Sequence, residues 1–259
     1  MKKILQNILA LSMVLILTVT ITACGSSSEG DTKGKDNTYQ IATDTTFAPF
    51  EYTDENNNFV GIDVDILAAI AEDQGFKYEL QSLGFDASLT AVQAGEVDGM
   101  IAGMSINDKR KETYDFSDPY YDSGVVVAVD AKSEYSSYED LKGKTVAVKN
   151  GTEGATFAES IKEEYDITLS YYDDSAYMYQ AVLNADADAC VEDYPVIGYG
   201  IAQGNGLKMI GEMVKGSSYG FAVLKGQNSE LIEMFNAGLK NIIENGTYDE
   251  IINKYIAEE

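Results

Sequence analysis

The sequence predicts an α/β protein, because strand-like and helix-like segments alternate along the chain from residue 39 onward. Short runs rich in apolar and β-branched residues, such as Tyr39–Thr43 and Thr145–Val148, are typical of strands. The helical patterns between them stop at glycine, as at Gly75 and Gly95, which is how helices commonly end. The length of 259 residues allows one large domain or two of ordinary size.

In the first half of the chain we expect three strands separated by two helices. Asp63 is expected to cap the first helix and Asp86 the second, because a carboxylate before a helix accepts hydrogen bonds from its free N–H groups. Asp65 falls in the first turn, so both it and Asp63 are interpreted as helix-start acids rather than metal ligands. The predicted elements are strands at Tyr39–Thr43, Tyr78–Ser82 and Gly99–Ala102 and helices at Val64–Asp73 and Asp86–Ala94.

The same alternation restarts after the apolar run Gly124–Val129. A short helix is expected to open at Ser137, and the turn Asn245–Thr247 separates two C-terminal helices. The remaining predicted elements are strands at Thr145–Val148, Thr168–Tyr172, Ala187–Val191, Leu207–Ile210 and Phe221–Leu224 and helices at Thr152–Glu164, Ser175–Ala185, Pro195–Gln203, Ser229–Glu244 and Tyr248–Ala257.

The N-terminus has the pattern of a secretory signal peptide, residues 1–23, with two lysines before an apolar run that is too short for a stable transmembrane helix. It ends in Ile21-Thr22-Ala23-Cys24-Gly25, which resembles a bacterial lipobox. That resemblance implies cleavage before Cys24 and acylation there, including palmitate, which would anchor the protein to the outer face of the cell membrane. An ordinary signal peptide with a chance cysteine is the alternative. The polar residues 24–38 are expected to form a flexible tether.

Composition excludes several classes of function. The formal charge of −25 becomes −27 without the two leader lysines (16 basic minus 43 acidic residues), so nucleic acid is not an expected partner. The chain has no histidine, the commonest metal ligand and general base, and neither a metal nor another cofactor is expected. Cys190 is interpreted as a small buried residue and not as a disulfide partner of Cys24.

The chain uses one arginine, Arg110, against seventeen lysines. A guanidinium differs from an ammonium in gripping a carboxylate with two parallel hydrogen bonds. Arg110 is therefore a candidate for binding the α-carboxylate of a ligand. A solvated ion pair with Asp108 or Glu112 is the alternative.

The residues around Arg110 resemble the polar amino-acid solute-binding proteins of ABC importers, solute-binding family 3. The resemblance lies in Ala102-Gly103-Met104-Ser105-Ile106-Asn107-Asp108-Lys109-Arg110, in Asp115-Phe116-Ser117-Asp118-Pro119-Tyr120-Tyr121 and in residues 61–71, and it extends over nearly all of the mature chain. It implies a two-lobed, type II periplasmic-binding-protein-like fold, in which each lobe is a mixed sheet flanked by helices and two hinge crossings join the lobes. Lobe 1 would comprise residues 39–121 and 219–259, and lobe 2 residues 122–218.

The resemblance also implies a ligand site at the ends of the strands, closest to that of the glutamine-binding members. Arg110 and the Ser105 N–H would hold the α-carboxylate, and Gly103, the Ser105 hydroxyl and Asp193 the α-ammonium. Asp44 and Lys149 would meet the ligand's side chain, with the aromatic rings of Phe47 and Phe85 as walls. The expected ligand-binding residues are Asp44, Phe47, Phe85, Ala102, Gly103, Ser105, Arg110, Lys149, Thr152, Glu153 and Asp193, the N–H groups of Thr152 and Glu153 favouring an anion at a helix start.

Taken singly, these residues have plainer interpretations. Asp44 could close a local turn, Phe85 could pack in a core and Lys149 could be an exposed lysine. Glu192 departs from the glutamine-binding pattern, and its carboxylate could either favour a cationic ligand or pair with Lys149.

The expected function is extracytoplasmic binding of a polar amino acid, glutamine first, by closure of two lobes, with delivery of the ligand to the permease subunits of an ABC importer. We expect a monomer that performs no chemistry on its ligand. The alternatives are binding of arginine or lysine, a dehydratase-type enzyme on the same fold, or a sensor that presents its ligand to a membrane receptor.

Overall fold

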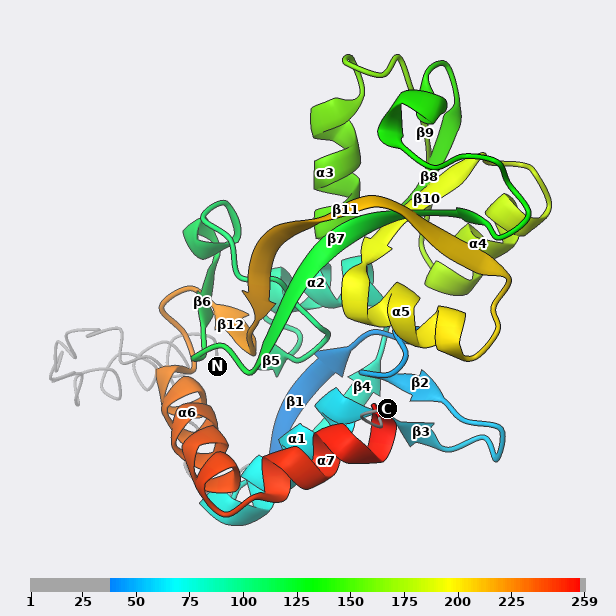
Figure 1. Ribbon diagram of the computed structural model, residues 1–259. Helices are drawn as coiled ribbons and strands as arrows, with labels where there is room; N and C mark the ends of the chain where they lie inside the picture. Colours follow the sequence, from blue (N-terminus) through cyan, green and yellow to red (C-terminus); the bar gives the residue numbers. More distant parts are fainter. Residues whose placement is uncertain (1–37, 257–259) are drawn as a thin grey trace, which may run out of the picture. The chain divides into compact units, whose positions relative to one another are not determined.

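The computed structural model describes residues 38–256, apart from the side chains of residues 215–217, and contains two five-stranded sheets (Figure 1). Each sheet belongs to one of two lobes, as the resemblance implied. The predicted signal peptide, Cys24 and residues 24–37 of the predicted tether lie outside the described residues. Thr38, the last residue assigned to the tether, already belongs to the first strand. The precise residue boundaries of the lobes stay a prediction.

Lobe 1 is built on a mixed sheet with the strand order β4-β1-β5-β12-β6. Its first three strands are parallel, and β12 joins them antiparallel to β5 and β6. The strands are β1 (Thr38–Thr43), β4 (Lys77–Ser82), β5 (Gly99–Met100), β6 (Tyr114–Phe116) and β12 (Ala222–Leu224), and a separate hairpin comprises β2 (Tyr52–Thr53) and β3 (Phe59–Val60).

Lobe 2 has the mixed sheet β11-β7-β10-β8-β9. Strands β10, β8 and β9 are parallel, while β7 pairs antiparallel with both β10 and β11. The strands are β7 (Tyr121–Asp130), β8 (Thr145–Lys149), β9 (Thr168–Tyr172), β10 (Ala189–Asp193) and β11 (Leu207–Tyr219).

Two long antiparallel strands make the crossings between the lobes. Strand β7 leaves lobe 1 and β11 returns to it, and Tyr121 at the start of one is paired with Tyr219 at the end of the other (Figure 1). The sequence predicted only Leu207–Ile210 as a strand here, whereas β11 extends over 13 residues. Its pairing with β7 continues through two shifts of register, so backbone hydrogen bonds rather than local propensity maintain it.

Helices cover both faces of each sheet, which explains why the central strands are apolar on both sides. In β7, Val125, Val127 and Val129 pack into one core cluster and Val126 and Ala128 into another. The described helices are α1 (Ile62–Gln74), α2 (Phe85–Ala94), α3 (Glu153–Ile161), α4 (Ser175–Leu183), α5 (Tyr194–Ala202), α6 (Ser229–Glu244) and α7 (Thr247–Tyr255), with short 3₁₀ turns η1 (Arg110–Glu112) and η2 (Tyr138–Leu141).

Two of the predicted helix caps are wrong. The residues before α1 and α2 are Gly61 and Gly84, and neither helix has a side-chain cap. Both helices start one or two residues earlier than expected because buried Ile62 and Phe85 belong to their first turns. Asp86 is a first-turn acid, and Asp63 is fully buried with contacts described below. The glycine stops are confirmed, since Gly75 and Gly95 both adopt left-handed conformations.

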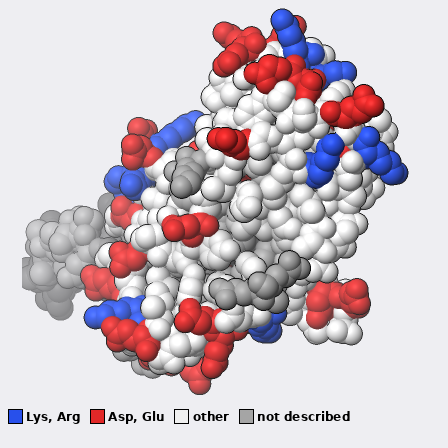
Figure 2. All heavy atoms as spheres, viewed as in Figure 1, with Lys and Arg blue, Asp and Glu red and all other residues white. Residues whose placement is uncertain are grey.

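None of the helices in residues 38–256 has the length and hydrophobicity that a membrane span requires. Figure 2 shows acidic and basic side chains mostly toward the edges of the visible face, with largely uncharged surface between them. No group of three or more His, Cys, Asp or Glu residues in this part of the chain could hold a metal ion.

Candidate functional site

Polar residues from both lobes meet where parallel strands end. Asp44 directly follows β1, Gly103 and Ser105 follow β5, Lys149 is the last residue of β8, and Asp193 is the last residue of β10. The carboxyl ends of parallel strands are where open α/β sheets hold their ligands. One pocket joins these strand ends and is lined by Asp44, Phe47, Phe85, Gly103, Ser105, Arg110, Lys149, Thr152, Glu153, Glu192 and Asp193.

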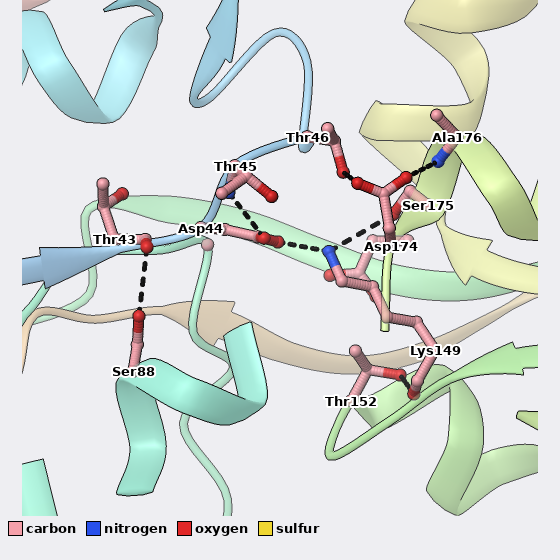
Figure 3. Close-up of polar contacts among 12 residues, drawn as sticks. Thr43, Asp44, Thr45, Thr46, Ser88, Lys149, Thr152, Asp174, Ser175 and Ala176 are labelled. Carbon is pink, nitrogen blue, oxygen red and sulfur yellow. Dashed lines mark hydrogen bonds and ion pairs between the residues drawn. The ribbon is translucent and has the colours of Figure 1, made fainter. Parts of the chain in front are cut away.

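At one end of the pocket, Lys149 of lobe 2 is paired with Asp44 of lobe 1 (Figure 3). Both side chains are only 1% exposed. Asp44 also accepts a hydrogen bond from the Thr45 N–H at 2.7 Å, and the Lys149 ammonium lies 5.4 Å from the centre of the Phe47 ring. Burial opposes the charge of Lys149, but the Asp44 and Glu192 carboxylates outweigh it and raise the lysine pKa.

A chain of hydrogen bonds links Lys149 to Glu192 through a serine. Lys149 donates to the Ser175 hydroxyl at 3.3 Å, and Ser175 donates to Glu192 at 2.9 Å. Glu192 also accepts from the Tyr179 hydroxyl at 2.9 Å and from the Asp193 N–H at 3.0 Å. Burial raises the pKa of Glu192, while Lys149 and these donors oppose the rise. Of the two interpretations of Glu192, this arrangement favours the one in which it supports Lys149.

At the other end, Arg110 donates its hydrogen bonds to neutral groups. Its two terminal nitrogens donate to the carbonyl of Ser105 at 2.8 Å and to the carbonyl of Gly151, in lobe 2, at 2.9 Å. The guanidinium lies 5.2 Å from the centre of the Phe85 ring. Burial lowers the pKa of Arg110, and the carboxylates that most oppose this change are Glu153 and Asp193. These two acids, rather than Asp108 or Glu112, dominate the field at the guanidinium.

Asp193 lies in the same pocket on lobe 2 and is buried. Its carboxylate accepts a hydrogen bond from Tyr219 at 2.6 Å, and Ser123 donates to the Tyr219 hydroxyl at 3.0 Å. Burial and the neighbouring Glu192 raise the pKa of Asp193 to about 7, against the hydrogen bond from Tyr219 and the charge of Arg110. A cation beside Asp193 would stabilise its ionised form.

Gly103 lies beside the aromatic wall and is restricted to glycine for two reasons. Its φ of +50° is in the left-handed region, and a Cβ atom there would lie 2.3 Å from the Phe47 ring. The Gly103 N–H donates to Asp63 at 2.8 Å, which fixes the direction of this peptide. Phe47 and Phe85 are each 5% exposed, so the pocket walls are rigid aromatic surfaces.

The start of α3 forms part of the pocket wall. Thr152 caps this helix by accepting from the Ala155 N–H at 3.2 Å, and its own N–H lies 3.4 Å from the Lys149 carbonyl. Glu153 is the first residue of the helix, and its side chain accepts from Asn107 of lobe 1 at 2.9 Å. The helix N-terminus is favourable for an anion, whereas the Glu153 carboxylate balances the charge of Arg110.

Direct contacts join the lobes around the pocket. Thr46 of lobe 1 donates to Asp174 of lobe 2 at 2.9 Å, next to the Lys149 end (Figure 3). Asn107 and Glu153 form the corresponding contact at the Arg110 end. The structure is therefore a closed arrangement, with polar bridges on both sides of the pocket.

Ten of the eleven residues predicted for the site line this pocket. Ala102 does not, because its side chain packs in the lobe 1 core with Ala42 and Met104. Glu192, which the sequence singled out only as a departure, lines the pocket as well. The sequence analysis missed three residues that donate hydrogen bonds to the acids of the pocket, namely Ser175, Tyr179 and Tyr219. No local pattern marks them, because each comes from a different element than the acid it contacts. The ligand roles of all these residues stay a prediction.

Residues 39–258 match the family described as bacterial extracellular solute-binding proteins, family 3. The chain belongs to this family. The solute-binding protein is 31% identical over 252 residues to the arginine-binding extracellular protein ArtP of Bacillus subtilis, with 97% of this chain and 98% of the relative covered. It is 30% identical over 277 residues to the glutamine-binding protein GlnH of the same organism, covering 100% of this chain and 99% of the relative.

Among solved structures, an ancestral arginine-binding protein bound to arginine superimposes on this solute-binding protein with a TM-score of 0.78. Sequence identity is 37%, and 85% of this chain and 98% of the other are covered. An ancestral arginine-binding protein bound to glutamine superimposes with the same TM-score of 0.78, at 37% identity. The expected family is confirmed and glutamine-binding GlnH is among the relatives, although proteins named for arginine and histidine match more strongly than GlnH.

Proposed function

We propose that this protein binds a free polar amino acid, glutamine first, between its two lobes and delivers it to an ABC importer. The relatives and the family support amino-acid binding and transport. The observation that carries the choice of ligand is one pocket whose wall combines the Lys149–Asp44 ion pair with Arg110 and Asp193.

The Arg110 end suits the zwitterionic part of an amino acid. The guanidinium supplies N–H donors for an α-carboxylate, and Asp193 supplies an acceptor for an α-ammonium. Because Arg110 comes from lobe 1 and Asp193 from lobe 2, neither lobe offers both contacts by itself. A ligand held by both groups would therefore favour the closed form.

The Lys149 end suits a carboxamide side chain. An amide offers one acceptor, for the Lys149 ammonium, and two donors, for the Asp44 carboxylate. A glutamate side chain would place a second carboxylate beside Asp44, and a lysine or arginine side chain would place a second cation beside Lys149. Like charges in a buried site are strongly disfavoured.

Arginine is the second candidate, because Glu192 lines the pocket and several relatives are named for arginine. The wall of the pocket has more carboxylates than cations, namely Asp44, Glu153, Glu192 and Asp193 against Arg110 and Lys149. A cationic ligand would reduce this imbalance. Glutamine remains first because the Glu192 carboxylate already accepts hydrogen bonds from three donors of lobe 2, one of which, Ser175, links it to Lys149.

A thermal-shift screen over the twenty amino acids, followed by calorimetric titration, tests the ligand assignment. A ligand that binds only the native state stabilises it by RT ln(1 + [L]/Kd), so at equal concentration the tighter ligand gives the larger rise in melting temperature. Glutamine is expected to give the largest shift, with a dissociation constant on the order of micromolar or below. A larger shift with arginine or lysine would instead select the basic class, and no shift with any amino acid would refute the proposal.

The absence of catalysis is part of the proposal and has its own test. With no histidine in the chain, acid–base chemistry would depend on carboxylates such as Glu192 and Asp193. Prolonged incubation with the bound amino acid should return it unchanged by mass spectrometry. Any turnover product would favour an enzyme on the same fold.

Anchoring through Cys24 completes the proposed location outside the cell membrane. The wild-type chain should incorporate labelled palmitate, and Cys24→Ser should not. The unanchored variant should then appear in the medium.

Delivery to an importer is tested by uptake. Transport of labelled glutamine into cells should require the permease and ATPase subunits of an ABC importer. A receptor-kinase response without uptake would favour the sensor alternative.

A further inference from the structure

Two carboxyl groups lie in the core beneath the pocket without enough donors. Glu51, next to the hairpin strand β2, and Asp63, in the first turn of α1, are both 0% exposed. If both acids are ionised, three of their four carboxylate oxygens have no hydrogen-bond donor among the described residues. These are both oxygens of Glu51 and one oxygen of Asp63. Leaving such acceptors unpaired costs about 1–3 kcal/mol or more each.

A single proton shared between the two carboxyl groups would satisfy one oxygen of Glu51 and the unpaired oxygen of Asp63. The Asp63 N–H donates to the carbonyl of Phe50, the residue before Glu51, at 2.9 Å, which brings the two side chains together. We propose that Glu51 is a neutral acid whose O–H donates to Asp63, and that this carboxyl pair positions the Gly103 peptide at the pocket wall. The proposal concerns the frame of the pocket and does not depend on which ligand the pocket takes.

The hydrogen bonds of Asp63 connect the pair to the pocket. Its other oxygen accepts from the Gly103 N–H and from the Tyr120 hydroxyl, each at 2.8 Å. Gly103 contacts the Phe47 wall, and Tyr120 lies just before the crossing strand β7. Asp63 therefore ties the segment after β5 to the crossing.

Glu51 is joined to the aromatic wall through the backbone. Phe47 and Glu51 form an isolated bridge, in which the Phe47 N–H donates to the Glu51 carbonyl at 2.8 Å. A proton between Glu51 and Asp63 thus links the loop that carries Phe47 to the peptide that packs against its ring. Two ionised carboxylates at the same place would repel each other and separate these segments.

The charges around Glu51 support a neutral acid. Burial is the main cause that raises its pKa, and the carboxylates of Asp63 and Asp44 act in the same direction. Lys149 opposes them, and it is already paired with Asp44. Tyr120 also faces the pair, but its hydroxyl donates to Asp63 and not to Glu51.

Infrared spectroscopy of the ligand-free protein tests the proton directly. The wild type should show the C=O stretch of a protonated carboxyl group at pH 8, and Glu51→Gln should remove it. Glu112→Gln, which changes an exposed acid of the same lobe, is the matched control and should leave the band in place. A wild-type spectrum without a protonated carboxyl band at pH 8 would overturn the proposal, whether or not the variant folds.

The pH dependence of unfolding gives a second test with a defined sign. A folded state that retains a proton the unfolded chain releases loses stability as pH rises above the unfolded pKa of about 4.3. Glutamine at position 51 donates an N–H in place of the O–H and cannot titrate. The folding constant of Glu51→Gln relative to wild type should therefore rise by up to tenfold per pH unit between about pH 5 and 8. A ratio that stays flat or falls would contradict a retained proton.

Ligand binding separates positioning from general stability. Glu51→Gln should retain the wild-type affinity for the amino acid found in the screen, because the link to Asp63 and Gly103 survives. Glu51→Met, which fills the space without a donor, should weaken binding at least tenfold at pH 7. Equal affinity in the two variants would show that the pair does not position the pocket. If no amino acid binds the wild type, the infrared and unfolding tests still decide the state of the proton.

Discussion

The two opposite-charge pairs in the pocket are arranged differently. Asp44 and Lys149 bind each other across the lobes and are almost completely buried. Arg110 and Asp193 also come from different lobes, but each uses neutral partners: two backbone carbonyls for the guanidinium and the Tyr219 hydroxyl for the carboxylate. The charges of Asp44 and Lys149 therefore compensate each other, whereas those of Arg110 and Asp193 do so only at a distance.

The two arrangements suit two different tasks, closure of the lobes and contact with a charged ligand. A pair that meets in the closed form favours closure and can accept a polar group inserted between its members. In the proposed complex, Arg110 and Asp193 would meet the two charged groups of the ligand from preset positions, and such preorganised contacts give affinity without large rearrangement. Variants at the two ends should therefore have different effects.

The largest effect is expected from Arg110→Ala, at the end that faces the ligand. An unpaired α-carboxylate in the closed pocket should cost about 2–5 kcal/mol of binding free energy, measured by calorimetric titration. The urea-induced unfolding of the ligand-free protein should change far less. Lys109→Ala, an exposed neighbouring cation, is the control. Unchanged affinity in Arg110→Ala would remove the distinction between the two pairs.

Lys149→Met should act through the compensated pair. It leaves Asp44 buried without its cation, which should weaken glutamine binding by roughly 1–3 kcal/mol and favour an open form detectable by small-angle scattering. Asp44→Asn combined with Lys149→Met should recover part of the closure, because no unpaired charge remains. Lys144→Met breaks only a half-exposed pair with Asp188 and should have little effect. Independent effects at Asp44 and Lys149 would argue against a functional pair.

Gly103 lies against the Phe47 ring in the pocket wall. Two glycine variants measure how much this close approach contributes to ligand binding. Gly103→Ala and Gly95→Ala both place alanine at positive φ, but only Gly103 has a ring within reach of the new Cβ. Binding should weaken by about 1–3 kcal/mol in Gly103→Ala, through displacement of Phe47, and stay near wild type in Gly95→Ala. Similar affinities in both variants would mean that displacement of the Phe47 ring does not impair ligand binding.

The smallest expected effect is the pH dependence of binding at the Asp193 end. Its pKa of about 7 means that below neutral pH a proton competes with the ligand's ammonium. Affinity should fall by up to tenfold per pH unit as pH decreases from 7. Glu192→Gln removes a carboxylate that raises this pKa, so the fall should move to lower pH. A profile that does not shift would assign the titration to another group.

Much of the fold could be predicted from the sequence. Regular alternation of strand and helix patterns indicated the elements, and Gly75 and Gly95 marked two helix ends correctly because left-handed conformations strongly favour glycine. The long strand β11 and the starts of α1 and α2 were not predictable, since pairing with β7 and burial of Ile62 and Phe85 decide them. Asp63 shows the same limit: its position suggested a helix cap, yet it binds a peptide 40 residues away.

The sequence by itself determined the class of elements, the family and the set of residue types that can meet a zwitterion, because these depend on local pattern and on the chemistry of single side chains. Only the tertiary structure decided which charges compensate each other, why Ala102 packs in the core and how Ser175 connects Glu192 to Lys149. Those outcomes depend on distances between strand ends that come together only when both sheets form. The energy of a buried charge depends on such partners, and no local pattern specifies them.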